Sequence, residues 1–279
     1  MTTSTTPTRG RVSFVGAGPG AADLLTLRAA QRIAEADIVI WAASLVHEDV
    51  LAHARPDALV VNSVEHSLEG ITHLYEKAAA EDLLVARIHS GDPALWGGTQ
   101  EQHELCTRLG LATEVIPGVS SFTAVAALVQ RELTIPEVAQ SVVLTRLEGG
   151  KTPMPSGETV RGFAAHGATM ALFLSAARTK QLQDELLAAG PFDEATPCVV
   201  AYAVTWPDEL VFECALGELA AKVREHKLYK HTMVLVGPAL ASGGTRSHLY
   251  DPGHFHEHRK VESQERRAEL RERDRALKR

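Results

Sequence analysis

A glycine-rich loop with one carboxylate is the stretch of this sequence best suited to chemistry. It reads Ser90-Gly91-Asp92-Pro93-Ala94-Leu95-Trp96-Gly97-Gly98 and follows an apolar run at 83–88, which predicts a buried strand with a turn at its carboxyl end. Ligands bind at that edge in open α/β sheets. Gly91 lets a ligand approach the main chain, and Asp92 can accept hydrogen bonds from ribose hydroxyls or an ammonium group. An ordinary turn between a strand and a helix is the alternative.

A second glycine-rich loop, Gly16-Ala17-Gly18-Pro19-Gly20, follows the first predicted strand and resembles a dinucleotide fingerprint. Three residues argue against that interpretation. Pro19 removes a backbone donor from the loop, and Asp23 stands where a pyrophosphate requires a free helix N-terminus. The next strand ends in Trp41 rather than in an acid for the ribose. The pattern therefore disfavours a dinucleotide-dependent oxidoreductase, and we expect Asp23 to cap the helix at 24–35.

A third loop, Pro117-Gly118-Val119-Ser120-Ser121, follows a predicted strand at 113–116. It precedes an alanine-rich helix expected at 122–130. The hydroxyls of Ser120 and Ser121 suit the cap of that helix, and they also suit contact with a ligand beside the loop at 90–98. Both interpretations stay open on the sequence alone.

The order of strands and helices predicts an α/β protein with two α/β domains. In the first domain strands and helices alternate, which is typical of a mainly parallel sheet. In the second, a weakly alternating strand at 210–214 reads as a hairpin partner of the strand before it, so we expect a mixed sheet. The predicted divisions are an N-terminal domain at 10–118, a C-terminal domain at 119–241 and a charged extension at 242–279.

Composition narrows the possible partners. The 279 residues carry a formal net charge of −7, which argues against a nucleic-acid partner. The three cysteines are widely spaced without a Cys-x-x-Cys pair, which favours a reducing cytoplasm over a disulfide framework or a zinc site. The Thr-rich start lacks the apolar core of a signal peptide, and no apolar run is long enough to predict a membrane span.

The end of the chain differs from the rest. Residues 257–279 hold nine Lys or Arg and six Asp or Glu, which predicts a solvated helix or a disordered tail. Four histidines precede or enter this stretch, and metal binding by them is an alternative that we do not adopt, so no metal site is predicted. They are His248, His254, His256 and His258.

Four motifs in a fixed order connect the sequence to a known family. They are Gly16-Ala-Gly-Pro-Gly20, Ser90-Gly-Asp-Pro93, Pro117-Gly-Val-Ser120 and Leu235-Val-Gly237. Over residues 11–237 the chain resembles the tetrapyrrole (uroporphyrinogen, precorrin and corrin) methyltransferases. Further stretches are similar to the precorrin-4 C11-methyltransferase branch of cobalamin biosynthesis: Ser44-Leu-Val46, Glu132-Leu-Thr-Ile-Pro136, Leu144-Thr-Arg146 and Thr205-Trp-Pro-Asp208.

The resemblance implies a fold and a reaction. Two α/β domains would enclose a trough, S-adenosylmethionine would lie between them, and the protein would be a homodimer. The methyl group would pass to C11 of precorrin-4 and give precorrin-5. A sulfonium is already a good leaving group, so alignment of the two reactants and exclusion of water carry most of the catalysis. We therefore predict no covalent nucleophile and assign no catalytic residue.

The resemblance also implies site residues. Those expected to bind the cofactor are Pro19, Gly91, Asp92, Pro93, Leu95, Ser120, Ser121, Leu174, Val204 and Thr232. Those expected to contact the substrate are Gly18, Gly20, Ser44, Trp96 and Arg146. Plain core packing is the alternative for Leu174 and Val204, and a structural salt bridge is the alternative for Arg146.

Some positions depart from the branch pattern. The branch usually has Tyr at the positions of Trp41 and Trp96, Gly or Asp at Ala43, and often a basic residue at Ala203. These departures concern substrate preference rather than fold. The alternatives are methylation of cobalt-precorrin-4 or of another corrin carbon, and a non-catalytic protein that binds the tetrapyrrole or the cofactor.

Overall fold

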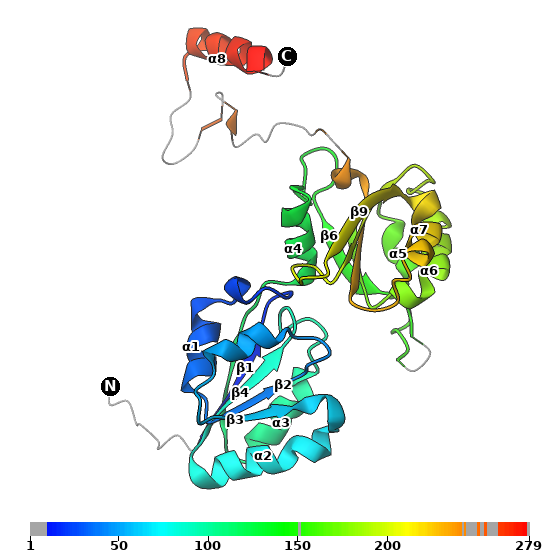
Figure 1. Cartoon of the computed structure of the whole chain (residues 1–279). Helices are drawn as coiled ribbons and strands as arrows, with labels where there is room; N and C mark the ends of the chain where they lie inside the picture. The colour runs from blue at the N-terminus through cyan, green and yellow to red at the C-terminus, as the bar shows by residue number, and fades with distance from the viewer. Residues whose placement is uncertain are drawn as a thin grey trace.

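The chain forms two five-stranded sheets, each with its own helices, and the predicted fold class is confirmed (Figure 1). The computed structural model describes residues 10–149, 152–241, 243, 250–251, 254–255 and 262–277. The first sheet is entirely parallel and the second is mixed. The expected boundary after Gly118 falls between the last strand of the first sheet and the next helix.

The first sheet has the strand order β3-β2-β4-β1-β5. The chain moves outward from β1 to β3 and then returns to β4 and β5, so β1 and β4 are neighbours at the point where the direction of winding reverses. The loops that follow these two strands therefore meet at the edge where α/β sheets bind ligands. The strands are β1 (Arg11–Gly16), β2 (Ile38–Trp41), β3 (Leu59–Asn62), β4 (Leu84–His89) and β5 (Ala112–Ile116).

Helices cover both faces of this sheet because each face carries its own apolar cluster. On one face Ile33 of α1 and Val50 of η2 pack with Val15 of β1. On the other face α2 and α3 pack against Phe14 and its neighbours. The helices are α1 (Leu27–Glu35), α2 (Leu68–Glu81) and α3 (Thr99–Arg108), with short 3₁₀ helices η1 (Ala22–Leu24), η2 (Glu48–His53) and η3 (Ser63–Glu65).

The expectation that Asp23 caps the first helix is wrong. Asp23 lies within η1, and the extended backbone of Leu25 separates η1 from α1. Thr26 is the N-cap, and its side chain accepts a hydrogen bond from the backbone N–H of Ala29 at 3.1 Å. A threonine hydroxyl three residues before a free N–H satisfies the same requirement that we had assigned to the carboxylate.

The second sheet has the order β6-β7-β10-β8-β9, and only β6 and β7 run parallel. The antiparallel pairing of β8 with β9 confirms the predicted hairpin. Because α4 occupies one face and α5, α6 and α7 occupy the other, residues of both faces are buried. The strands are β6 (Val142–Arg146), β7 (Thr169–Phe173), β8 (Pro197–Tyr202), β9 (Leu210–Ala215) and β10 (Thr232–Val236).

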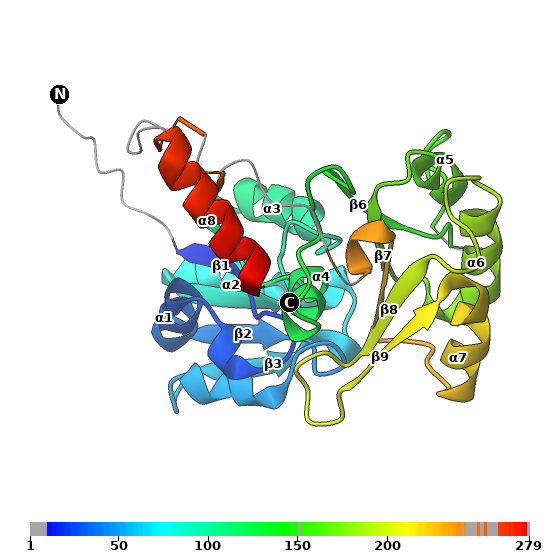
Figure 2. The same ribbon diagram turned by 90° about the horizontal axis from the view of Figure 1, so that it is seen from above.

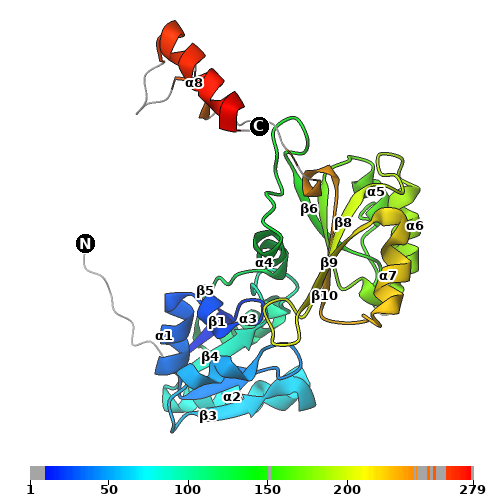
Figure 3. The same cartoon turned by 45° about the horizontal axis from the view of Figure 1, so that its top comes forward.

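The helix α4 (Ser121–Leu128) lies at the junction of the two domains, where it follows the first sheet and packs on the second (Figure 3). The remaining helices of the second domain are α5 (Val160–Ala164), α6 (Thr179–Leu187), α7 (Leu219–Glu225), η4 (Ala176–Arg178), η5 (Leu216–Glu218) and η6 (Pro238–Leu240).

A last helix, α8 (Gln264–Leu277), lies apart from both sheets (Figures 1 and 3). Its side chains are mostly exposed, in agreement with the predicted solvated helix. Among the helices in the described ranges, none combines the length and the hydropathy that a bilayer crossing requires.

The three motif loops of the first domain touch one another through their main chains. Gly18 and Gly91 exchange two hydrogen bonds, from Gly91 N to Gly18 O at 2.7 Å and from Gly18 N to Gly91 O at 3.2 Å. A Cβ atom at Gly118 would lie 2.1 Å from the carbonyl oxygen of Gly91 and 2.9 Å from Cα of Gly16. Glycine is therefore required at 118 for space, since only a residue without a side chain permits this approach.

The variant Gly118→Ala tests this packing. The added methyl group has to displace main chain rather than a flexible side chain, so we expect a loss of about 1–3 kcal/mol in the free energy of unfolding. Gly149→Ala is the matched control, because its Cβ atom would meet nothing closer than 3.5 Å. Urea denaturation of both variants measures the difference, and equal stability of the two would contradict the account.

Candidate ligand-binding site

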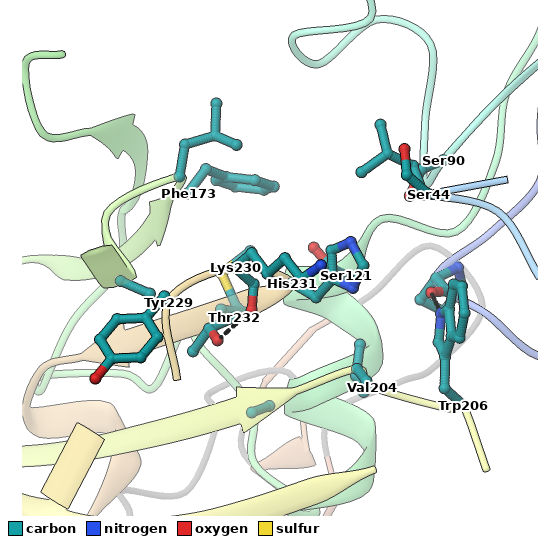
Figure 4. A pocket seen from close by; sticks show the side chains of 17 residues that line it. Ser44, Ser90, Ser121, Phe173, Val204, Trp206, Tyr229, Lys230, His231 and Thr232 are labelled. Atoms are coloured by element: carbon teal, nitrogen blue, oxygen red, sulfur yellow. Dashed lines mark hydrogen bonds between the residues drawn. The ribbon is translucent and has the colours of Figure 1, made fainter. Parts of the chain in front are cut away.

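A cavity of about 470 Å³ opens between the two domains (Figure 4). Six of the residues expected to bind the cofactor or substrate line it: Pro19, Ser44, Ser121, Leu174, Val204 and Thr232. Its walls also contain residues that the sequence analysis did not assign to the site, among them Ser90, Phe173, Ala203, Trp206, Lys230 and His231. Trp206 belongs to the motif Thr205-Trp-Pro-Asp208, and Ala203 is one of the positions that depart from the branch pattern. No motif in the sequence marked Lys230 or His231.

The other expected site residues do not line this cavity. Most of them belong to the three motif loops of the first domain, whose residues Pro19, Ser90 and Ser121 do line it: Gly18, Gly20, Gly91, Asp92, Pro93, Leu95 and Ser120. Trp96 packs against a wall residue, and Arg146 lies at the end of β6.

The carboxylate of Asp92 ties two motif loops together. Its Oδ1 accepts a hydrogen bond from the N–H of Ala94 at 2.8 Å, and its Oδ2 accepts one from the N–H of Gly118 at 3.1 Å. Both oxygens therefore have backbone partners. We had expected this carboxylate to contact a ligand directly, and the structure gives it a role in holding the loops.

A contact between the domains closes one end of the cavity. The indole N–H of Trp206 donates a hydrogen bond to the carbonyl oxygen of Pro19 at 2.9 Å, and the hydroxyl of Thr205 accepts one from the N–H of Ala21 at 2.9 Å. A Cβ atom at Gly20 would lie only 2.3 Å from Cδ1 of Trp206. Gly20 is thus a position where the indole needs space.

Aromatic contacts extend this closure. The ring of His47 meets that of Trp206 edge-on with a centroid distance of 5.1 Å, and the ring centroid of His231 lies 5.9 Å from the indole. Trp96 of the first domain packs against Phe173 of the second at 4.5 Å. Ring pairs at these separations are attractive beyond simple burial. The pairs His47–Trp206 and Trp96–Phe173 each join the two domains, so they help to hold the domains in one relative orientation.

Strained backbone gathers at the same cavity. Leu174, Ala203 and His231 all have positive φ angles, of 52°, 46° and 52° respectively, and all three line the wall. Leu174 is also 72% exposed, which is unusual for a leucine at the end of a buried strand and excludes plain core packing. Non-glycine residues in this conformation cost free energy and cluster where ligands bind.

The serines of the third loop do not cap α4 through their hydroxyls. Ser120 occupies the N-cap position without a side-chain hydrogen bond to the helix, and Ser121 is the first helical residue. The capping alternative is therefore wrong, and Ser121 instead faces the cavity.

Arg146 organises the loop that follows β6. Its guanidinium donates to the carbonyl oxygens of Leu147 at 3.4 Å, Thr152 at 3.2 Å and Pro153 at 3.2 Å. Within the described residues, these carbonyl oxygens are hydrogen-bond partners of the guanidinium, so its position needs neither a ligand carboxylate nor a salt-bridging acid.

Two largely buried basic side chains, Arg87 and His89, lie on β4 just before the loop at 90–98. The guanidinium of Arg87 donates to Gln102 Oε1 at 3.1 Å and to Ser63 Oγ at 3.0 Å. Burial lowers the pKa of Arg87. Burial and the neighbouring Arg87 charge also lower the pKa of His89 to about 3, so this histidine is neutral at physiological pH.

Metal binding has no support within the described residues, where no group of three His, Cys, Asp or Glu side chains comes together. Of the four histidines considered for a metal site, His248, His256 and His258 lie outside the described residues.

Comparison with known proteins identifies the family. The family model described as Tetrapyrrole (Corrin/Porphyrin) Methylases matches residues 11–220. The chain belongs to the tetrapyrrole methylases. A precorrin-4 C(11)-methyltransferase from a Sinorhizobium species is 42% identical over 244 residues, which cover 87% of this chain and 96% of that protein. A cobalt-precorrin-4 C(11)-methyltransferase from Methanocaldococcus jannaschii is 39% identical, over 90% of this chain and 96% of that one.

Solved structures agree with this assignment. The X-ray structure of a cobalt precorrin-4 methyltransferase superimposes with a TM-score of 0.80 at 40% identity, over 83% of this chain and 96% of that one. The uroporphyrin-III C-methyltransferase of Thermus thermophilus, solved with S-adenosylhomocysteine, superimposes with a TM-score of 0.69 at 28% identity, over 83% of this chain and 99% of that one. The tetrapyrrole methylase assignment therefore extends over both sheets.

The variant Asp92→Asn tests the loop-tying role. The amide places an NH₂ group opposite one of the two backbone donors, so we expect the free energy of unfolding of the ligand-free protein to fall by about 1–3 kcal/mol. Asp23→Asn is the control, because Asp23 is exposed. Thermal unfolding of both variants measures the effect. An unchanged free energy of unfolding in Asp92→Asn would contradict the role of this carboxylate in holding the two loops together.

The buried histidine predicts a pH dependence. Between about pH 6.5 and 3 the unfolded chain binds a proton at His89 and the folded chain does not, since its folded pKa is about 3. Stability should therefore fall as the pH drops through this window, by up to about 1.4 kcal/mol per pH unit from this residue. We expect His89→Gln to show a shallower slope in urea denaturation between pH 6 and 5. Equal slopes, or an NMR titration of His89 near pH 6.5, would refute the prediction.

Proposed function

We propose that this protein transfers a methyl group from S-adenosylmethionine to C11 of precorrin-4 in cobalamin biosynthesis. The observation that carries the proposal is the cavity between the domains, whose walls contain six of the residues that the resemblance assigns to cofactor or substrate. The relatives named as C(11)-methyltransferases span almost the same length as this chain, which supports the same activity here.

The residues around the cavity fit S-adenosylmethionine. Its volume, about 470 Å³, lies within the range of small-molecule sites, and its wall is predominantly apolar. The apolar side chains of Leu174 and Val204 suit the adenosine part, while Ser121 and Thr232 supply hydroxyls. When bound, this donor supplies a methyl group on a sulfonium, which needs no covalent activation by the protein.

The contribution of the chain is then to position and to exclude water. The hydrogen bond from Trp206 to Pro19 and the pair Trp96–Phe173 hold the two domains together around the cavity. The three motif loops of the first domain, which carry Pro19, Ser90 and Ser121 of the cavity wall, are held together through their main chains. The hydrogen bonds of Asp92 and of the Gly18–Gly91 pair join them. Rigid alignment of two reactants accounts for about 7–11 kcal/mol of barrier lowering in favourable cases.

A further part of the proposal is whether the tetrapyrrole substrate carries cobalt. Relatives named for precorrin-4 and for cobalt-precorrin-4 match this chain at similar identity, 42% and 39%. We propose precorrin-4 as the substrate, with cobalt-precorrin-4 as the second candidate. On the same resemblance we propose a cytoplasmic homodimer.

Incubation with S-adenosylmethionine and each tetrapyrrole separately tests the function. We expect mass spectrometry to show the gain of one methyl group on precorrin-4, and NMR to place it at C11. A gain on cobalt-precorrin-4 alone would move the protein to the second candidate. The absence of a methyl gain on both tetrapyrroles, with S-adenosylhomocysteine still bound, would overturn the proposed activity.

A further inference from the structure

The cavity wall carries a basic side chain and no acidic one, in contrast to the net negative charge of the whole chain. Its lining contains no Asp or Glu, although the chain as a whole carries a net charge of −7. Lys230 is the one lysine or arginine among the lining residues, and its side chain is exposed. Within the described residues, Lys230 forms no ion pair, so its ammonium group is available to a ligand.

The backbone around Lys230 is fixed, which sets the position from which its side chain extends. The carbonyl oxygen of His231 accepts a hydrogen bond from Ala203 N at 2.9 Å, and that of Lys230 accepts one from the hydroxyl of Thr232 at 2.8 Å. The ring of His231 packs near Trp206. Figure 4 shows Lys230, His231 and Thr232 side by side in the pocket, between Phe173 and Val204.

We propose that Lys230 binds a carboxylate of a ligand in this cavity and so determines how that ligand is oriented. The inference rests on the proposed function, which brings two carboxylate-bearing molecules to this place. One source is the amino-acid end of the methyl donor, and the other is an acidic side chain of the tetrapyrrole. An ammonium group with three donors suits a carboxylate from either source.

Physical reasons favour a binding role over simple solvation. An acid-free wall leaves the field of this lysine uncompensated, while the acidic remainder of the protein repels polycarboxylates from other surfaces. A single cation on the cavity wall then distinguishes one end of an anionic ligand from the other. The effect on affinity is moderate, because the ammonium stays in contact with water.

The experiment compares Lys230→Gln and Lys230→Arg with Lys227→Gln. Lys227 is also exposed and lies on the same connection between α7 and β10, but it does not line the cavity. Calorimetry measures the Kd of S-adenosylhomocysteine and of methylthioadenosine, which lacks the carboxylate. Methyl-transfer kinetics measure the KM of the tetrapyrrole.

If the methyl donor supplies the carboxylate, Lys230→Gln raises the Kd of S-adenosylhomocysteine about three- to tenfold and leaves the Kd of methylthioadenosine unchanged. If the tetrapyrrole supplies it, the KM of the tetrapyrrole rises by a similar factor and both Kd values stay the same. In either case Lys230→Arg retains most of the affinity and Lys227→Gln behaves as the unaltered protein.

An unchanged Kd and an unchanged KM in Lys230→Gln would overturn the proposal, as would an equal effect of Lys227→Gln. These outcomes are separate from a failure of the proposed function. In that case the unaltered protein transfers no methyl group, while the two calorimetric measurements still test whether Lys230 binds the carboxylate of S-adenosylhomocysteine.

Discussion

The contact between three main-chain loops at the carboxyl edge of the first sheet is the constraint on which the site depends. Gly18 and Gly91 are joined by two backbone hydrogen bonds, and Gly118 approaches the carbonyl of Gly91 so closely that no side chain fits. The carboxylate of Asp92 then links the second loop to the third. These loops come from β1, β4 and β5, which lie side by side in the sheet. Their rigidity gives the cavity a fixed rim.

The second requirement is that the other domain meets this rim in one orientation. The turn after β8 carries Thr205 and Trp206, which bind the main chain of the first loop through two hydrogen bonds. As seen from above, the two domains lie side by side with α4 between them (Figure 2). The cavity is thus made from loops of the first domain and strand ends of the second, so neither domain can form it alone.

Much of the architecture could be predicted because it follows from local patterns. Apolar runs followed by turn residues predicted the strands at 83–88 and 113–116, and the alternation at 210–214 predicted the β8–β9 hairpin. The fold class, and with it the family, was predictable from four short motifs. The start of α1 was not, because Asp23 and Thr26 are both good capping residues and only the backbone decides between them.

The site itself was predictable only in part. Resemblance located Leu174 and Val204, but the sequence does not show that the backbone of Leu174 adopts a left-handed conformation and exposes its side chain. The sequence did not show that the Asp92 carboxylate accepts hydrogen bonds from the backbone N–H groups of Ala94 and Gly118, because those contacts depend on how the loops fold. The sequence did not place Lys230 and His231 at the cavity, because their position there arises from the pairing of β10 with β8.

The most direct test of the account is a crystal structure of the protein with S-adenosylhomocysteine. The account predicts that the ligand occupies the cavity between the domains, in contact with Pro19, Leu174, Val204 and Thr232, while the hydrogen bond from Trp206 to Pro19 stays intact. A ligand bound elsewhere on the first sheet, or a complex in which the two domains separate at Trp206, would contradict it.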